Sequence, residues 1–146
     1  MVRPCFHLSI PAIDLQRSHD WYVQALDCQP GRRSEQASIL DFQGHQLVLQ
    51  HTPQRLEPGQ PGIYPRHFGL VFETFTRWEQ LRLQLERRGC LFSVPPKCRY
   101  SGGPLEHHTL FVQDPSANWL EFKHYTHSEA VLGCRDQPQV GDQDLR

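Results

Sequence analysis

The stretch that decides the fold is Asp114-Pro-Ser-Ala-Asn-Trp-Leu-Glu-Phe-Lys123, in the last third of the 146-residue chain. Its first half is rich in turn-forming residues, and its second half is typical of a strand. Glu121 lies between Leu120 and Phe122, so one face of this strand is apolar and the other carries a carboxylate. A carboxylate in that position is expected where its face of the strand borders a polar site.

Two earlier strand-like segments carry a histidine in the equivalent place. Residues 5–10 contain His7 and residues 66–72 contain His67, each alternating with large apolar side chains. Strand parity predicts that His7, His67 and Glu121 all point away from the covering helices, and into one concavity if the sheet curves. Two imidazoles and one carboxylate are ligands suited to Fe(II) and acceptable to Mn, Zn or Ni. For each histidine taken singly, the alternative is a hydrogen-bonded structural residue.

The rest of the chain predicts two copies of one order of elements, namely a strand, a helix and three strands. The first copy is expected at strand 5–10 ended by Pro11, helix 15–26 capped by Asp14, a turn at Pro30-Gly31, and strands 32–34, 37–42 and 45–51. The second copy is expected at strand 67–72, a helix from a Thr76 cap to Gly89, strands 90–94, 106–112 and 119–124, and a loop over 97–105.

This order predicts an α+β fold of paired βαβββ modules that form a curved mixed sheet. The single domain covers residues 1–125, with module one at 4–51 and module two at 66–125. Residues 52–65 are crowded with proline and glycine and are expected to be a linker. Residues 126–146 are polar and are expected to form a C-terminal tail.

Net charge and cysteine content indicate which partners and which cellular compartment to expect. A formal net charge of -1 and a pI near 6.7 give no electrostatic reason to expect nucleic acid or an acidic membrane surface as a partner. The five cysteines are odd in number and none forms a Cys-x-x-Cys pair, and no leader precedes the first strand. We therefore expect a cytoplasmic protein without a disulfide scaffold.

Three segments together resemble the vicinal oxygen chelate superfamily, which includes glyoxalases, bleomycin-resistance proteins and extradiol dioxygenases. They are residues 6–15 with Trp21-Tyr22 and Leu26, residues 67–72, and residues 114–123. The last is the most specific, being close to the family pattern Asp-Pro-x-Gly-Asn-x-x-Glu. Ala117 stands where the family favours glycine. If this position needs a positive φ, alanine is mildly strained there. The resemblance implies modules around a cup, a divalent metal in that cup, and a homodimer.

The resemblance also implies which residues form the site. His7, His67 and Glu121 would be the metal ligands, with Fe(II) favoured and Mn(II), Zn(II) or Ni(II) as alternatives. Glyoxalase I members add an acidic ligand on the fourth strand, where this chain offers Gln46 and Gln50 but no carboxylate. The ligand set therefore resembles that of extradiol dioxygenases or fosfomycin-resistance thiol transferases.

We predict a dioxygenase-like, metal-dependent enzyme that uses O2 on a small substrate with two adjacent oxygens. His51 or His107 would be the catalytic base, although an exposed strand histidine is the alternative reading of His107. Gln50, Arg99 and Tyr100 are candidate substrate contacts, although the loop near Arg99 and Tyr100 could equally be ordinary surface.

Two rival functions remain open at this stage. One is a metal-dependent isomerase, lyase or thiol transferase, and the other is a non-catalytic binding protein of the bleomycin-resistance type. Binding proteins of that type typically lack the ligand set.

Overall fold

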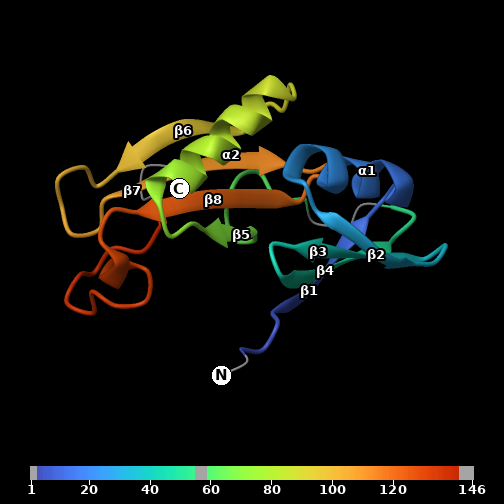
Figure 1. Cartoon of the computed structure of the whole chain (residues 1–146), viewed down its shortest axis with the longest axis horizontal. Coiled ribbons are helices and arrows are strands. Elements are labelled where there is room, and N and C mark those ends of the chain that lie inside the picture. Colours follow the sequence, from blue (N-terminus) through green and yellow to red (C-terminus); the bar gives the residue numbers. More distant parts are fainter. Residues whose placement is uncertain (1–2, 55–58, 142–146) are drawn as a thin grey trace. The chain divides into compact units, whose positions relative to one another are not determined.

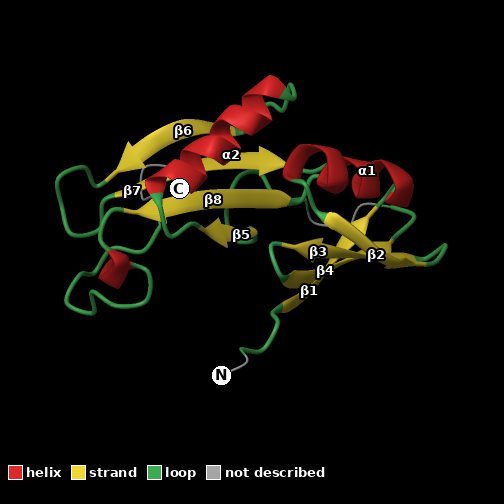
Figure 2. Ribbon diagram, in the orientation of Figure 1, coloured by secondary structure: helices red, strands yellow, loops and turns green. Residues whose placement is uncertain are grey.

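The computed structural model describes residues 3–54 and 59–141, which form eight strands, two α-helices and one short 3₁₀ helix (Figures 1 and 2). The chain divides into two compact units. Unit 1 comprises Met1–Gly59 with Gln113–Asn118, and unit 2 comprises Gln60–Val112 with Trp119–Arg146. Unit 1 contains β1 (His7–Ala12), α1 (Leu15–Leu26), β2 (Gln29–Arg33), β3 (Ala37–Phe42) and β4 (His45–His51). Unit 2 contains β5 (Phe68–Val71), α2 (Phe75–Arg87), β6 (Val94–Arg99), β7 (His107–Gln113), β8 (Trp119–Tyr125) and the 3₁₀ helix Ser128–Ala130.

The two units repeat one sheet topology. The strand order is β1-β4-β3-β2 in unit 1 and β5-β8-β7-β6 in unit 2. The first strand of each module pairs in parallel with the last, β1 with β4 and β5 with β8, while β2–β3, β3–β4 and β6–β7 are antiparallel. The predicted α+β class with paired βαβββ modules is confirmed, and each module forms its own four-stranded mixed sheet.

In unit 1 the apolar side of α1 packs on the sheet. The Asp14 side chain caps the helix by accepting a hydrogen bond from the Arg17 N–H at 3.0 Å, and Asp27 ends it in a left-handed conformation. The predicted helix bounds and cap are confirmed. Buried Tyr22 from α1 lies in the same core as Leu47 and Leu49 of β4. Since Leu47 and Leu49 face the helix, Gln46 and Gln50 face the opposite side of the sheet.

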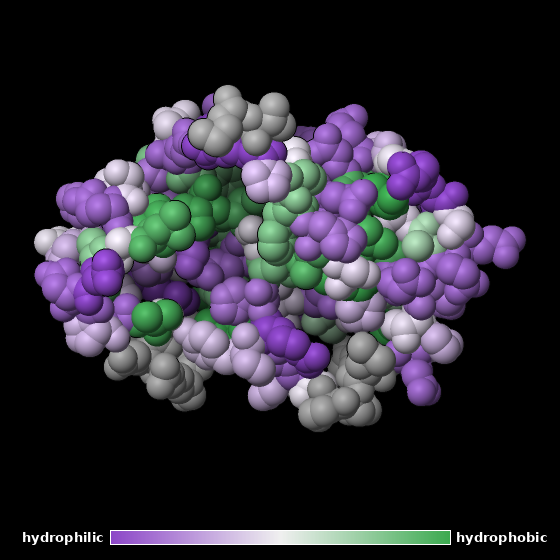
Figure 3. All heavy atoms as spheres, turned by 90° about the horizontal axis from the view of Figure 1, so that it is seen from below, coloured by the Kyte–Doolittle hydropathy of each residue, from purple (hydrophilic) through white to green (hydrophobic). Residues whose placement is uncertain are grey.

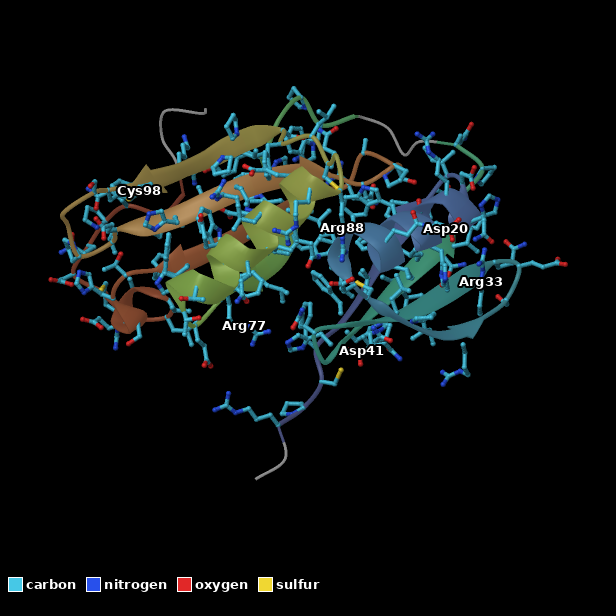
Figure 4. All side chains as sticks on the ribbon, turned by 45° about the horizontal axis from the view of Figure 1, so that its top comes forward. Asp20, Arg33, Asp41, Arg77, Arg88 and Cys98 are labelled. Carbon is cyan, nitrogen blue, oxygen red and sulfur yellow. The ribbon has the colours of Figure 1, made fainter. Side chains whose placement is uncertain are left out.

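In unit 2 the helix is anchored to the strand that carries Glu121. Trp78 of α2 is 2 % exposed, and its indole N–H donates to the Phe122 carbonyl of β8 at 2.9 Å. The helix begins after Thr74, whose side chain accepts from the Arg77 N–H, and not after the predicted Thr76. Figure 4 labels Arg77 and Arg88 near the two ends of this helix. Leu120 and Phe122 are therefore held on the helix side of β8, as predicted.

Several predicted boundaries are wrong because strands of this fold continue through proline. β1 continues through Pro11, and β2 continues through Pro30-Gly31. The second strand of the second module is Val94–Arg99 and not residues 90–94, so it includes part of the predicted loop. β1, β2 and β6 are edge strands, where proline costs no ladder hydrogen bond on the open side. In β2 and β6 the prolines also lie at register shifts.

The chain between β4 and β5 has no helix or strand in its described part. Of the predicted linker 52–65, residues 55–58 lie outside the described part of the chain, and the remaining residues form bends or irregular coil. Hydrophilic side chains cover most of the face shown in Figure 3. Within the described residues there is no helix long and apolar enough to cross a membrane.

The turn between β7 and β8 belongs to unit 1 and is organised by one buried carboxylate. Asp114 is 5 % exposed, and its Oδ1 accepts hydrogen bonds from the backbone N–H groups of Ser116 and Asn118, both at 2.9 Å. Its Oδ2 accepts from the Tyr22 hydroxyl and from the Asn118 amide, both at 2.7 Å. Burial raises the pKa of Asp114, although the hydrogen bonds from Asn118, Tyr22 and Ser116 act against that rise. Ala117 follows with a φ of 63°.

We expect Ala117→Gly to stabilise the protein. A left-handed alanine costs about 1–2 kcal/mol, whereas glycine raises the entropy of the unfolded chain by about 0.4–1 kcal/mol. The net gain in the free energy of unfolding is therefore roughly 0.5–1 kcal/mol, measurable by urea unfolding. Ala37→Gly, in the regular strand β3, is the control and should destabilise. A loss of stability in Ala117→Gly would contradict this account of the turn.

Candidate functional site

Two of the predicted ligands, His67 and Glu121, lie side by side in unit 2. His67 immediately precedes β5 and Glu121 lies in β8, and their Nε2 and Oε1 atoms are 3.3 Å apart. Glu121 is 6 % exposed, and its Oε2 accepts a hydrogen bond from the Thr109 hydroxyl at 2.6 Å. The His67 Nδ1 lies 2.7 Å from the Ile63 carbonyl oxygen, to which it donates as N–H. The ring is therefore oriented with Nε2 toward the carboxylate.

The pKa values of the two side chains are shifted in opposite directions. Burial would raise the pKa of Glu121, but the His67 hydrogen bond, the Lys123 charge and the Thr109 hydrogen bond together outweigh it and lower the pKa to about 2. The pKa of His67 is raised, mainly by its hydrogen bond to Glu121. Glu121 is therefore ionised at neutral pH, which is the form that binds a metal.

The donor atoms of this pair fit a divalent cation. With Nδ1 protonated and held by Ile63, a neutral His67 presents the Nε2 lone pair to a carboxylate oxygen, so two acceptor atoms face each other. Either a proton on Nε2 or a cation close to both atoms satisfies this arrangement. A hydrogen bond from the second ring nitrogen to a backbone carbonyl is also the usual way in which a metal-binding histidine is oriented.

Two further cations lie near the same carboxylate. Lys123 Nζ is 3.6 Å from Glu121 Oε1, and Arg99 NH1 is 3.8 Å from Glu121 Oε2. Arg99 is 7 % exposed, and its guanidinium lies over the ring of Phe111, 5.9 Å from the centroid. The face of the unit 2 sheet that carries Glu121 thus has two positively charged side chains, Arg99 and Lys123, against one negatively charged side chain. This count leaves out His67 and any bound metal.

His107 lies two residues before Thr109 in β7, so its side chain is on the same face of the sheet as Thr109 and Glu121. It is 4 % exposed, and its Nδ1 lies 2.9 Å from the Leu105 carbonyl oxygen, so Nε2 is left as the acceptor nitrogen. Its ring packs against Tyr125 with a centroid distance of 4.7 Å. Burial lowers the pKa of His107, and the charges of Lys123 and Arg99 lower it further. His107 is therefore neutral at pH 7.

The third predicted ligand, His7, lies in unit 1. It is exposed, and its Nδ1 is 2.7 Å from Oε1 of Gln46, the residue paired with it on β4. Gln50 shares the face of Gln46, whereas strand alternation puts His51 on the face of Leu47 and Leu49. Among the two predicted bases, this placement favours His107.

The structure thus brings together His67 and Glu121, with Arg99 and His107 on the same face of unit 2. Within residues 3–54 and 59–141, no group of three or more His, Cys, Asp or Glu side chains lies close enough to hold a metal. Convergence of His7 with the other two ligands stays a prediction, as do the roles of Gln50, His51 and Tyr100.

Most of the chain matches one described protein family. The family description "Glyoxalase/Bleomycin resistance protein/Dioxygenase superfamily" matches residues 5–122. The chain belongs to this superfamily. A glyoxalase/bleomycin resistance protein/dioxygenase from Alicyclobacillus acidocaldarius is 38% identical, with a TM-score of 0.80 over 87% of this chain and 95% of that one.

More distant structures share the superfamily fold. A lactoylglutathione lyase from Agrobacterium tumefaciens is 14% identical, with a TM-score of 0.64 over 83% of this chain and 92% of that one. The fosfomycin resistance protein FosX from Listeria monocytogenes is 12% identical, with a TM-score of 0.67 over 89% and 99%. A search of the curated proteins gives no match.

Sequence reasoning missed three groups around the candidate site: Lys123 beside Glu121, Tyr125 beside Lys123 and His107, and the Ile63 carbonyl beside His67. Lys123 and Tyr125 follow Glu121 at strand spacing and share its face, so alternation alone would have found them. The Ile63 carbonyl had no signal in the sequence, because it lies in the linker and acts through its backbone.

Gly69 is needed because β5 passes close to Glu121. The two residues pair in the parallel ladder, and a Cβ added at Gly69 would lie 1.6 Å from the Glu121 carbonyl oxygen. We expect Gly69→Ala to separate β5 from β8 and to lower the free energy of unfolding by roughly 3 kcal/mol or more. Gly62→Ala, where an added Cβ meets nothing within 4 Å, is the matched control. Equal stability of the two variants would contradict this register.

The pair also predicts a pH dependence of stability in metal-free protein. The Glu121 pKa falls from 4.5 to about 2 on folding, so its contribution is present above pH 4.5 and is lost as the pH falls towards 2. The raised pKa of His67 stabilises fully below pH 6.5, and this contribution is lost as the pH rises through the raised value. Glu121→Gln removes both contributions, of which the acid-side one is up to about 3 kcal/mol.

Urea unfolding between pH 2 and 5 should give a flatter profile for Glu121→Gln than for the wild type. An NMR titration should show the His67 pKa moving down in that variant. Glu73→Gln, at an exposed carboxylate, is the control. An unchanged His67 titration in Glu121→Gln would show that the two side chains do not interact.

Proposed function

We propose that this chain is a metal-dependent, dioxygenase-like enzyme that acts on a small substrate with two adjacent oxygens. His7, His67 and Glu121 would hold the metal, with Fe(II) favoured over Mn(II), Zn(II) or Ni(II). The observation that carries the proposal is the hydrogen bonding of Nδ1 in His7 and His67. In each, Nδ1 lies 2.7 Å from an oxygen acceptor, Gln46 Oε1 for His7 and the Ile63 carbonyl for His67, so Nε2 is the nitrogen left to bind.

The divalent ion would supply Lewis acidity and a template for the two substrate oxygens. The protein supplies a carboxylate that is already positioned and ionised. Glu121 is buried and ionised, and Thr109 fixes its second oxygen, so the carboxylate needs little rearrangement to bind a cation. Gln46 is engaged by His7, which supports a three-residue ligand set without a fourth ligand from β4.

The charge of the face favours an anionic substrate. Arg99 and Lys123 exceed the single negative charge of Glu121, and a bound divalent ion would increase the excess. A catecholate, an enolate or a carboxylate would offset this charge in a site where buried charges interact strongly. Arg99 is thus supported as a substrate contact, and Lys123 joins it.

His107 is proposed as the base that takes a proton from the substrate. Its Nδ1–H donates to the Leu105 carbonyl, so Nε2 carries the free lone pair. Its lowered pKa keeps it neutral and able to accept a proton at pH 7. The nearby cations would also stabilise the anion that forms when the substrate loses that proton.

A homodimer is proposed as the working form. His7, Ser9 and Gln50, on one face of unit 1, are exposed, which leaves this polar face accessible to a second chain. If the ligands come from two chains, His7→Ala and Glu121→Ala each lose high-affinity metal binding alone. Mixed dimers of the two variants would then regain up to half of the sites, whereas ligands from one chain give no recovery on mixing.

The direct test is metal analysis of protein purified without chelator, followed by oxygen uptake with catechols. The proposal expects about one equivalent of iron per chain and uptake that Glu121→Gln abolishes. Glu79→Gln, on the surface of α2, is the matched control and should keep both. Tight Zn or Ni without oxygen uptake would favour an isomerase, lyase or thiol transferase. A protein that binds none of Fe(II), Mn(II), Zn(II) and Ni(II) would contradict the proposal.

Lys123→Met offers a second test that does not depend on the substrate. Because Lys123 Nζ lies 3.6 Å from Glu121 Oε1, it competes with a metal ion for that oxygen. We expect Mn(II) affinity, measured by calorimetry, to rise several-fold in Lys123→Met and to stay unchanged in Lys97→Met, on the edge strand β6. Weaker Mn(II) binding in Lys123→Met would show that Lys123 supports the metal site instead.

A further inference from the structure

The segment after β8 returns to the sheet of unit 2 and is fastened at both of its described ends. At its start, the Thr126 N–H donates to the Glu106 carbonyl at 3.0 Å, just before β7. At its far end, the Tyr100 hydroxyl donates to the Gly141 carbonyl at 2.7 Å, just after β6. Residues 126–141 therefore form a loop closed onto the loop between β6 and β7, and not a loose tail.

Gly141 is suited to this contact in two ways. Its φ is +79°, which side chains other than glycine rarely adopt. A Cβ at this position would lie 2.4 Å from the Tyr64 hydroxyl oxygen. The backbone of Gly141 is thus in close contact with two tyrosines, one from the linker before β5 and one from the loop after β6.

Each of these tyrosines also contacts a histidine of the candidate site. The ring centroids of Tyr64 and His67 are 6.0 Å apart, and those of Tyr100 and His107 are also 6.0 Å apart. One ring therefore connects Gly141 to each histidine. The segment is thus fastened to two tyrosines, one of which contacts the proposed ligand and the other the proposed base.

We propose that residues 126–141 are a strap that controls access to His67 and His107, with Tyr64 and Tyr100 as its fastening points. In this role Tyr100 positions the strap, and it does not bind substrate. The inference goes beyond the proposed function, since it concerns the accessibility of two histidines and holds whether or not they bind a metal.

The strap has the properties of a segment that opens easily. Leu132 is 96% exposed and Val140 is 84% exposed, so these large apolar residues add little burial. The hydrogen bond from Tyr100 is a single neutral one, worth about a fivefold change in an opening equilibrium. Segments with few buried contacts open at low free energy, before the sheets unfold.

The test is the rate at which diethyl pyrocarbonate modifies individual histidines of the full chain, followed by peptide mass spectrometry. In Tyr100→Phe, which removes only the hydroxyl, we expect modification of His67 and His107 to become about fivefold faster. Gly141→Ala should act in the same direction, because its Cβ collides with the Tyr64 hydroxyl. His51, in unit 1, is the internal reference.

Gly89→Ala is the matched control. Gly89 has a φ of +73°, and an added Cβ meets nothing within 4 Å, so this variant imposes similar backbone strain away from the strap. Its modification rates should equal those of the wild type. Tyr100→Phe keeps the test decisive if Gly141→Ala folds poorly. The proposal is overturned if neither variant accelerates His67 or His107 beyond Gly89→Ala, or if His51 accelerates in proportion.

Discussion

The four hydrogen bonds accepted by the Asp114 carboxylate are the constraint on which the site depends. A buried carboxylate is costly unless its oxygens are satisfied, and here two backbone N–H groups, one amide and one phenol satisfy them. The same turn is held by Asn118, which donates to the Pro11 carbonyl at 2.9 Å, and by the Ser116 hydroxyl, which accepts from the Ile13 N–H at 2.9 Å. The turn is therefore fixed before β8 begins at Trp119.

A fixed turn matters because strand parity has a period of two. Glu121 follows Asn118 by three residues, and a slip of one residue would turn Leu120 or Phe122 toward the polar face. The pairing of Gly69 with Glu121 and the bond from Trp78 to the Phe122 carbonyl hold the same register from the other side. These contacts lie on the backbone and the helix side of β8. They determine that Glu121, and not Leu120 or Phe122, points to the polar face of the sheet.

The polar face itself depends on electrostatic balance. Burial disfavours the charge on Glu121, and His67, Thr109 and Lys123 reverse that effect. The result is a carboxylate that stays ionised among cations. This arrangement suits the binding of a further cation at Glu121 and of an anion at Arg99 and Lys123, which are the two requirements of a site that holds a metal and an anionic substrate together.

The sequence predicted the parts of this structure that depend on alternation and on turn residues. Helix 15–26, strands 37–42 and 45–51, and the pairing of His67 with Glu121 follow from patterns of that kind. It did not predict β6, because pairing with β7 overrides the unfavourable Pro95-Pro96 at an irregular edge. Nor did it predict the contact of Gly141 with Tyr64 and Tyr100, because contacts made by the backbone of a loop leave no periodic signal.

The superfamily fold is common to proteins named as lyases, resistance proteins and dioxygenases, so the reaction depends on the ligands and the charges around them. The central claim is that His7, His67 and Glu121 bind one divalent metal. X-ray absorption spectroscopy of the chain loaded with one equivalent of Zn(II) tests it most directly. The account predicts two imidazole nitrogens and a carboxylate oxygen around the metal in the wild type, with one imidazole lost in His7→Ala. A wild-type spectrum without imidazole scattering, or one that His7→Ala leaves unchanged, would contradict it.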